Sequence, residues 1–188
     1  MGPPANFVGA VCPLGLILAR TDRLAVVATA ADVYPTGWVI EISVRYAGDD
    51  DLLVSQHHVL HSSLWDAEPT EPEAFSYGIE FFEGDRWEKL QPPQAALWAR
   101  PLERSPGPLV QPCGATGTRS RLDLRAWLHP LPSSEGKVAV SCRWLGAGIP
   151  LSRSEFPAER IVGAASQAVR LWDGEPPDGN QLWLTISS

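Results

Sequence analysis

The chain has 188 residues, of which 44% are hydrophobic and 20% charged, and its formal net charge is −7 at pH 7. This length and apolar content are those of one globular domain with its own core, and they exclude an intrinsically disordered chain. Lys and Arg form no run, and the acidic balance would repel both phosphate backbones and anionic lipids. Neither nucleic acid nor a membrane is therefore expected as a partner.

The apolar stretch from Phe7 to Ala19 is shorter than the ~20 residues that a membrane-spanning helix needs. A signal peptide begins with a positively charged region, but the residues from Met1 to Ala10 include no Lys or Arg. The three cysteines, Cys12, Cys113 and Cys142, are an odd number without a close pair, which argues against a disulfide framework. We expect a cytoplasmic protein that needs no cofactor.

Two hairpins are predicted in the first half of the chain. In the first, the apolar segment 24–33 leads through Tyr34-Pro35-Thr36-Gly37 into the alternating segment 38–46. In the second, the alternating segment 75–81 turns at Glu83-Gly84-Asp85 into a short strand that contains Trp87.

The second half of the chain predicts three more strands and one helix. The strands cover 122–128, 138–144 and 149–156, and the helix covers 157–173, with Pro157 in its first turn. On this helix Ile161, Ala165, Ala168 and Trp172 would share one face. Segments rich in Pro, Gly or polar residues predict long loops at about 48–74 and 91–119 and a C-terminal tail at 175–188.

Consecutive antiparallel strands followed by a single late helix favour a mainly β fold. We expect an antiparallel two-sheet β-sandwich with one C-terminal helix, formed by residues 1–188 as a single domain.

Five segments, taken in order and spacing, also carry a family resemblance: Thr21-Asp22-Arg23, Tyr34-Pro35-Thr36-Gly37, Tyr77-Gly78-Ile79-Glu80-Phe81, Trp127-Leu128-His129-Pro130-Leu131-Pro132, and Cys142-Arg143-Trp144 through Trp172. Over most of the range from Leu16 to Trp172 the chain resembles a family of small uncharacterised actinobacterial proteins that carries no established activity. The resemblance implies a shared β-rich fold and no reaction.

Eight tryptophans are more than the core of such a domain requires, and Trp is enriched at protein interfaces. Trp38, Trp144 and Trp172 fit apolar faces of predicted strands and of the helix. Trp65 and Trp98 fall in predicted loops, and Trp127 lies opposite the apolar face of its strand. Trp65, Trp98 and Trp127 are therefore the candidate binding residues.

The sequence signals for a catalytic or metal site are weaker than those for the fold. His57 and His61, together with Asp66, could ligate a metal, although a polar loop explains the same residues and the Glu that zinc hydrolases place after the first His is missing. Glu41 and Glu80 could form the carboxylate pair of a glycosidase, although outward strand positions are polar in any case. Cys113 could be a nucleophile with His129 as its general base, but no surrounding motif supports this pair.

The sequence favours a non-enzymatic protein-interaction or assembly module, which would bind a protein partner or itself. Two alternatives stay open. One is a hydrolase, metal-assisted or carboxylate-based, and the other is a sandwich that binds a small molecule or carbohydrate.

Overall fold

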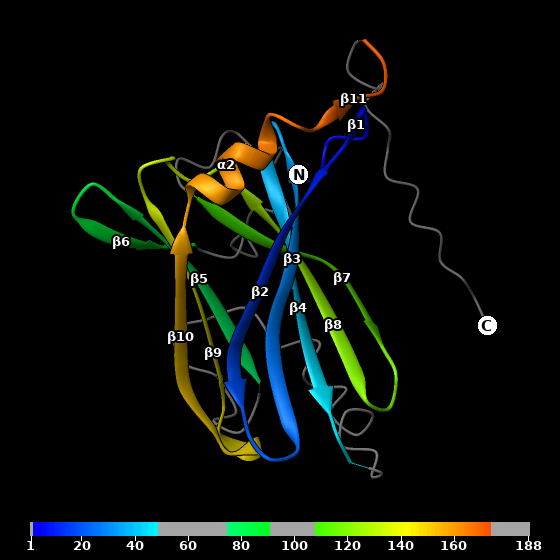
Figure 1. Ribbon diagram of the computed structural model, residues 1–188, viewed down its shortest axis with the longest axis vertical. Helices are drawn as coiled ribbons and strands as arrows, with labels where there is room; N and C mark the ends of the chain where they lie inside the picture. Colours follow the sequence, from blue (N-terminus) through cyan, green and yellow to red (C-terminus); the bar gives the residue numbers. More distant parts are fainter. Residues whose placement is uncertain (1, 49–74, 91–107, 174–188) are drawn as a thin grey trace, which may run out of the picture.

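The computed structural model of the protein describes residues 2–48, 75–90 and 108–173 (Figure 1). In this part the chain forms strands, one α-helix and a short 3-10 helix, whose bounds in chain order are β1 (Phe7–Val8), β2 (Ala10–Arg20), β3 (Leu24–Tyr34), β4 (Gly37–Tyr46), β5 (Ser76–Glu83), β6 (Arg86–Lys89), β7 (Leu109–Gly117), β8 (Arg121–His129), β9 (Lys137–Trp144), η3 (Leu145–Ala147), β10 (Ile149–Pro157), α2 (Glu159–Ala165) and β11 (Val169–Arg170).

Five strands form one antiparallel sheet in the order β2-β3-β4-β8-β7. Its centre is the predicted first hairpin, which is confirmed: β3 and β4 pair from Leu24 opposite Tyr46 to Tyr34 opposite Gly37. Pro35 and Thr36 are left as the two turn residues. Four more strands form a second antiparallel sheet in the order β10-β9-β5-β6.

The second sheet contains the other predicted hairpin, β5–β6, which is also confirmed. Gly84 at its turn has a φ of 65°, a left-handed conformation that glycine adopts without a steric penalty. The predicted strands at 122–128, 138–144 and 149–156 correspond to β8, β9 and β10.

The two sheets pack face to face and share one core. The inner face of β4 supplies Trp38, Ile40, Ile42 and Val44, which are at most 1% exposed. Across the core the Trp38 ring stacks on Phe81 of β5, with the ring centroids 6.5 Å apart. The mainly β antiparallel sandwich that the alternation predicts is therefore confirmed, and a third sheet, formed within the described residues by β1 and β11 alone, was not predicted.

One side of the sandwich is closed by β2 and β10, which lie side by side in Figure 1. The hydroxyl of Ser152 on β10 donates a hydrogen bond to the carbonyl of Leu18 on β2. One end is covered by α2, which packs on β2 and β3 and buries Ile161 completely.

The helix is shorter than the predicted 157–173. Pro157 is the last residue of β10, and α2 ends at Ala165. Val169 and Arg170 form β11 instead, pairing with Val8 and Phe7 of β1. Backbone pairing with the start of the chain replaces the last helical turns here, and it leaves Trp172, assigned to the inner helical face, 50% exposed.

The predicted loop at 91–119 also needs a correction, because β7 occupies Leu109–Gly117. The Pro and Gly residues of this segment predicted a loop, because both are unfavourable inside a strand. β7 is, however, the last strand of its sheet, where the missing N–H of Pro112 disturbs only one side, and the register shifts between Pro112 and Gly114.

The predicted loop at 48–74 and the tail at 175–188 lie outside the described residues, apart from Gly48. Phe7 to Ala19, the longest apolar stretch, forms β1 and most of β2. No helix in the described ranges is both long and apolar enough to cross a membrane.

Candidate functional site

The outer face of the five-stranded sheet, which points away from the four-stranded sheet, carries one organised group of polar side chains. The alternation of β4 sends Ile40, Ile42 and Val44 into the core. It therefore sends Glu41, Ser43 and Arg45 to the outer face, as expected for successive residues of a strand.

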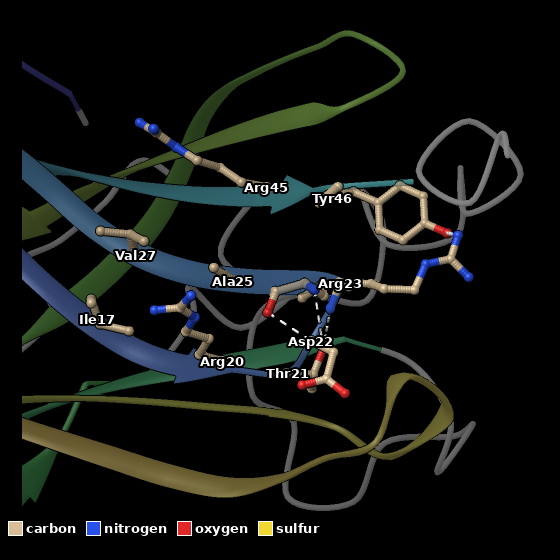
Figure 2. A pocket seen from close by; sticks show the side chains of 11 residues that line it. Ile17, Arg20, Thr21, Asp22, Arg23, Ala25, Val27, Arg45 and Tyr46 are labelled. Atoms are coloured by element: carbon tan, nitrogen blue, oxygen red, sulfur yellow. Dashed lines mark hydrogen bonds between the residues drawn. The ribbon is translucent and has the colours of Figure 1, made fainter. Parts of the chain in front are cut away.

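A pocket of about 300 Å³ opens over one end of this face, where β2 turns into β3 and β4 ends (Figure 2). We call it the arginine pocket. The residues that line it are Ile17, Arg20, Thr21, Asp22, Arg23, Leu24, Ala25, Val27, Arg45, Tyr46 and Ala47. It brings three guanidinium groups together with a single carboxylate, that of Asp22.

The turn between β2 and β3 forms one wall of the arginine pocket. The amide of Leu24 donates to Thr21 Oγ1 at 3.0 Å, and the amide of Thr21 donates to the Leu24 carbonyl at 2.8 Å. Ser and Thr hydroxyls favour such turns because they satisfy nearby backbone N–H groups. The turn sets the two arginines on its flanks, Arg20 and Arg23, at the pocket rim.

Arg23 closes the far end of the pocket against Tyr46. Its guanidinium donates to the Tyr46 hydroxyl, and its central carbon lies 5.0 Å from the Tyr46 ring centroid. The Ala47 amide donates to the Arg23 carbonyl at 2.7 Å. Side chain and backbone thus tie the β2–β3 turn to the end of β4.

Arg20 and Arg45 are placed differently, on the two strands that flank β3. Arg20 pairs with Ala25, and Ala25 pairs with Arg45 on its other side. Two strand spacings put the backbones of Arg20 and Arg45 ~10 Å apart, with only a methyl group between them. Figure 2 shows both side chains extending back over the sheet toward Val27, whereas Arg23 extends away toward Tyr46.

Arg20 and Arg45 form no ion pair with the described residues, although the charge of Arg45 acts on nearby Asp123. Among the described residues Arg20 has no hydrogen-bond or ion-pair partner, and Arg45 makes one hydrogen bond, from Nε to Ser43 Oγ at 3.4 Å. Other arginines of the outer face are paired: Arg125 with Asp32, and Arg121 with Asp123. On the described part of this face, Arg20 and Arg45 thus differ from Arg121 and Arg125 in having no ion pair.

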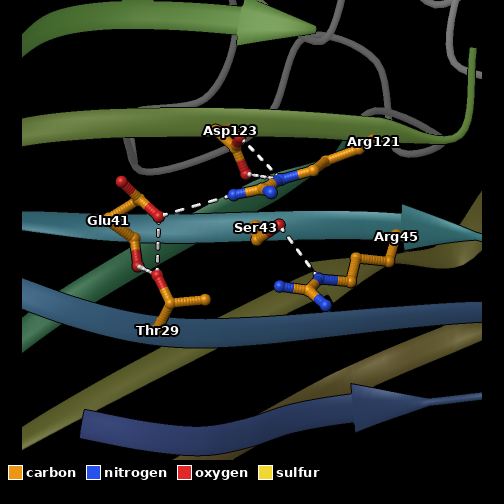
Figure 3. A network of polar contacts seen from close by, with 6 residues as sticks. All are labelled: Thr29, Glu41, Ser43, Arg45, Arg121 and Asp123. Atoms are coloured by element: carbon orange, nitrogen blue, oxygen red, sulfur yellow. Dashed lines mark hydrogen bonds and ion pairs between the residues drawn. The ribbon is translucent and has the colours of Figure 1, made fainter. Parts of the chain in front are cut away.

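Next to the arginine pocket lies a polar network on β3, β4 and β8 (Figure 3). Thr29 donates to Glu41 Oε1 at 2.8 Å, and Arg121 Nη2 lies 3.8 Å from the same oxygen. Arg121 Nε also lies 2.7 Å from Asp123 Oδ2. This network contains two carboxylates and one guanidinium, and the positive charge of Arg45 also acts on Asp123 from the pocket side.

The network holds the pKa of Asp123 below its ordinary value. Desolvation by itself raises this pKa. Hydrogen bonds from Arg121 and Ser43, together with the positive charges of Arg121 and Arg45, outweigh it. Asp123 thus stays ionised at physiological pH.

Of the candidate binding tryptophans, only Trp127 lies in the described part of the chain, and the expected exposure is wrong for it: it is 3% exposed. Trp127 does lie on the outer-face side of β8, opposite Val39. Its indole is covered there by the Tyr34 ring, with centroids 5.7 Å apart, and by the turn at Gly37. Period-two alternation identifies the face of the strand but not what covers it.

The remaining candidates Trp65, Trp98, His57, His61 and Asp66 lie outside the described residues. Within residues 2–48, 75–90 and 108–173, no three His, Cys, Asp or Glu side chains gather in a way that could hold a metal ion.

The proposed carboxylate pair is not brought together. Glu41 lies on the outer face of the five-stranded sheet, bonded to Thr29. Glu80 lies on the opposite surface of the sandwich, where Arg153 Nε donates to it at 3.1 Å, while its neighbours Ile79 and Phe81 fill the core. Two sheets ~10 Å apart separate the two carboxylates, too far for the ~5 to 9 Å of a glycosidase.

Cys113 and His129 are also apart. His129 pairs with Leu109, four residues from Cys113 along β7, which corresponds to ~13 Å. The His129 Nδ1 instead donates to the Thr36 carbonyl at 2.7 Å. Desolvation raises the pKa of the Cys113 thiol, so this cysteine is not an activated nucleophile.

The sequence interpretation did not single out Arg20 and Arg45. The available signal was indirect: Arg45 is an outward position of an alternating strand, and Arg20 adjoins the turn Thr21-Asp22-Arg23. Their juxtaposition depends on strand register.

Comparison with known proteins identifies no relative of the chain. No protein-family model matches the chain, and neither the curated proteins nor the solved structures include a significant match. The family resemblance of the sequence stays a prediction, and the function must be inferred from the site.

Proposed function

We propose that the protein is a non-enzymatic interaction module that binds a partner protein through the arginine pocket. The anchor on the partner is a carboxylate held between Arg20 and Arg45. The single observation that carries the proposal is the pair of arginines in strand positions on either side of Ala25, neither of which forms an ion pair with the described residues.

The chemistry follows from the guanidinium group. It is always charged and presents a planar fork of donors that matches a carboxylate in a bidentate way. Arg121 and Arg125 already use this fork on Asp123 and Asp32. Arg20 has the same fork and no hydrogen-bond or ion-pair partner among the described residues, and Arg45 donates only Nε, to Ser43, while its charge acts on Asp123. An external acidic group would take up the donors that both forks leave open.

The dimensions of the pocket favour an acidic side chain presented by a protein. At about 300 Å³ the pocket is at the lower limit of the ~300–1,000 Å³ typical of small-molecule sites. It is also an open depression on a sheet surface. Such sites accept one side chain of a larger partner, whose remaining surface contributes further contacts.

A random peptide library displayed on phage tests the proposal. Peptides selected on the folded protein are expected to be enriched in Asp and Glu, and their binding should weaken with added salt. Removing one charge-assisted bond costs ~1.5–3 kcal/mol, so Arg20→Ser and Arg45→Ser should each weaken a selected peptide ~10-fold or more.

The matched control is Arg86→Ser. Arg86 lies on β6 of the other sheet and its side chain is 74% exposed. It should leave binding within twofold. Selected peptides without acidic enrichment, or equal losses for all three variants, would contradict the proposal, and displacement of the peptides by millimolar acetate would assign the pocket to free small anions instead.

A further inference from the structure

We infer that residues 182–186, which lie outside the described part of the chain, dock as a third strand on the free side of β11 and cover an apolar face formed by β1 and β11. The inference is independent of the arginine pocket, which lies at the other end of β2. It derives from exposed aliphatic side chains, from the open edge of β11 and from the sequence that follows Asp173.

The first observation is an exposed apolar face on the two-stranded ribbon of β1 and β11. Val8 and Val169 lie directly opposite each other and are 52% and 58% exposed. Leu171, two residues beyond Val169 and therefore on the same face, is 49% exposed. Figure 1 shows the ribbon beyond α2, where it projects from the sandwich. Because an isolated two-stranded ribbon is only marginally stable in water, a further strand that covers this face would stabilise it.

The second observation is the free side of β11. The amide of Leu171 donates to the Asn6 carbonyl at 2.9 Å, so Leu171 directs its backbone groups toward the start of the chain. Backbone groups of successive residues in a strand point to opposite sides. The N–H and C=O of Arg170 therefore point away from β1, to a side where β11 has no neighbouring strand among the described residues. Such an open edge can accept another strand.

The chain supplies a suitable strand a short distance further on. Between residues 182 and 186 three aliphatic side chains alternate with Trp183 and Thr185, and no residue is charged. This is the pattern of a strand with one buried face. The connecting residues 174–181 include Pro176-Pro177-Asp178-Gly179, a combination typical of a turn. A turn there would bring the strand back antiparallel to β11. The aliphatic residues are Leu182, Leu184 and Ile186.

The two faces of the ribbon differ, and this difference determines which side of the docked strand is buried. Opposite the apolar face lies Arg170, whose guanidinium carbon is 5.6 Å from the Phe7 ring centroid. This face suits Trp183 and Thr185, because an aromatic ring attracts a guanidinium group over its face. The aliphatic residues of the docked strand then lie on the other face, over Val8, Val169 and Leu171.

The strand of the same chain is a more favourable occupant than a second copy. A short linker holds the two partners at an effective concentration on the order of millimolar, so docking within one chain needs no association step. Two copies, each with a net charge of −7, would repel each other. The uncharged residues 182–186 carry no such penalty.

NMR spectroscopy of the ¹³C,¹⁵N-labelled full chain tests the docking directly. Nuclear Overhauser effects are expected between methyl protons of Leu184 and those of Val169 or Leu171. The Arg170 amide should exchange with solvent at least tenfold more slowly in the parent than in Leu184→Asp, because a charge in the buried face undocks the strand. Ser188→Asp is the matched control: it adds the same charge outside the alternating residues and should leave exchange at Arg170 within twofold.

A second pair of variants tests the ribbon side of the contact. Leu171→Ser should abolish the contacts of Leu184 and shift the residues 182–186 to random-coil chemical shifts. Leu151→Ser is its control, because Leu151 is a 60% exposed aliphatic residue on β10, away from the ribbon. It should leave these shifts unchanged, and the amide spectrum reports that both variants are folded.

The outcomes separate the occupants. Random-coil shifts of residues 182–186 in the parent, or equal exchange of the Arg170 amide in the parent and in Leu184→Asp, would overturn the inference. Contacts that disappear on dilution, together with a dimer in analytical ultracentrifugation, would assign the strand to a second copy and overturn docking within one chain. None of these results bears on acidic peptides at the arginine pocket, so failure here leaves the proposed function to its own test.

Discussion

Replacing Ile42 by Asp should unfold the domain. Ile42 is 1% exposed and lies in the middle of β4, between Ala28 of β3 and Leu124 of β8. Losing its burial costs ~1.5–3 kcal/mol, and an unpaired carboxylate in the core costs several kcal/mol more. The sum, about 5 kcal/mol or more, reaches the whole stability of a typical domain, ~5–15 kcal/mol.

A milder substitution at the same position tests the packing of the core. Ile42→Val removes one methylene group and should cost ~0.5–1.5 kcal/mol. For a chain of this size each kcal/mol lowers Tm by ~2–4 °C, so a decrease of a few degrees is expected. Urea and thermal unfolding followed by tryptophan fluorescence measure both variants, because Trp38 is fully buried in the same core.

The control is Ile17→Asp, the same chemical change at a 60% exposed position of the same sheet. Its stability should change by less than ~0.5 kcal/mol. If Ile42→Asp kept a cooperative transition near that of the parent, or if Ile17→Asp were equally damaging, the assignment of inner and outer faces would be refuted.

Three further predictions concern the turn, the polar network and the cysteines. Gly37→Ala should destabilise, because a Cβ there would lie 2.4 Å from the Leu128 carbonyl oxygen and 2.6 Å from the Trp127 ring, whereas Gly163→Ala on α2 meets nothing within 4 Å and should stabilise by ~0.5–1 kcal/mol; comparable melting temperatures would contradict this. The pKa of Asp123 is lowered in the folded state, so its stabilising contribution is complete above the unfolded pKa of ~3.9 and is lost as the pH falls through the lower folded value. Asp123→Asn should therefore reduce stability near neutral pH and flatten its decline in acid, measured by urea unfolding at a series of pH values, while the exposed turn variant Glu135→Gln should leave the shape of the profile unchanged. Cys12 and Cys142 are buried, which raises the pKa of both thiols, that of Cys142 to about 11. Cys113 is exposed, although desolvation raises its pKa as well. A thiol reagent at pH 8 should therefore label Cys113 alone, and slowly, in the native protein and all three cysteines in urea, and rapid native labelling of two or more would contradict the core assignment.

Most of the strands could be predicted because their signal is local. A strand with one buried face alternates between apolar and polar residues, and Ile40, Ile42 and Val44 with Glu41 and Ser43 between them show this within one short window. Such a pattern depends on the geometry of the strand itself. It therefore determined the sandwich class and both hairpins without knowledge of the partners.

Elements that depend on distant pairing were not predictable in this way. β7 contains Pro112 and Gly114 and exists as a strand because β8 offers its edge. The helix stops at Ala165 because Val169 and Arg170 pair with the beginning of the chain. Long-range backbone pairing overrides local propensity at both places.

The same division applies to the candidate site. The sequence by itself determined that Arg45 points outward and that Thr21-Asp22-Arg23 follows an apolar stretch. Only the tertiary structure decided that Arg20 and Arg45 lie on either side of Ala25, because their juxtaposition depends on the register of three strands. It also decided that Trp127 is buried, since Tyr34 and the turn at Gly37 cover a position that alternation alone assigns to the surface. A strand's own period determines the direction of its side chains, whereas their neighbours and their burial come from chain segments that the local sequence does not contain.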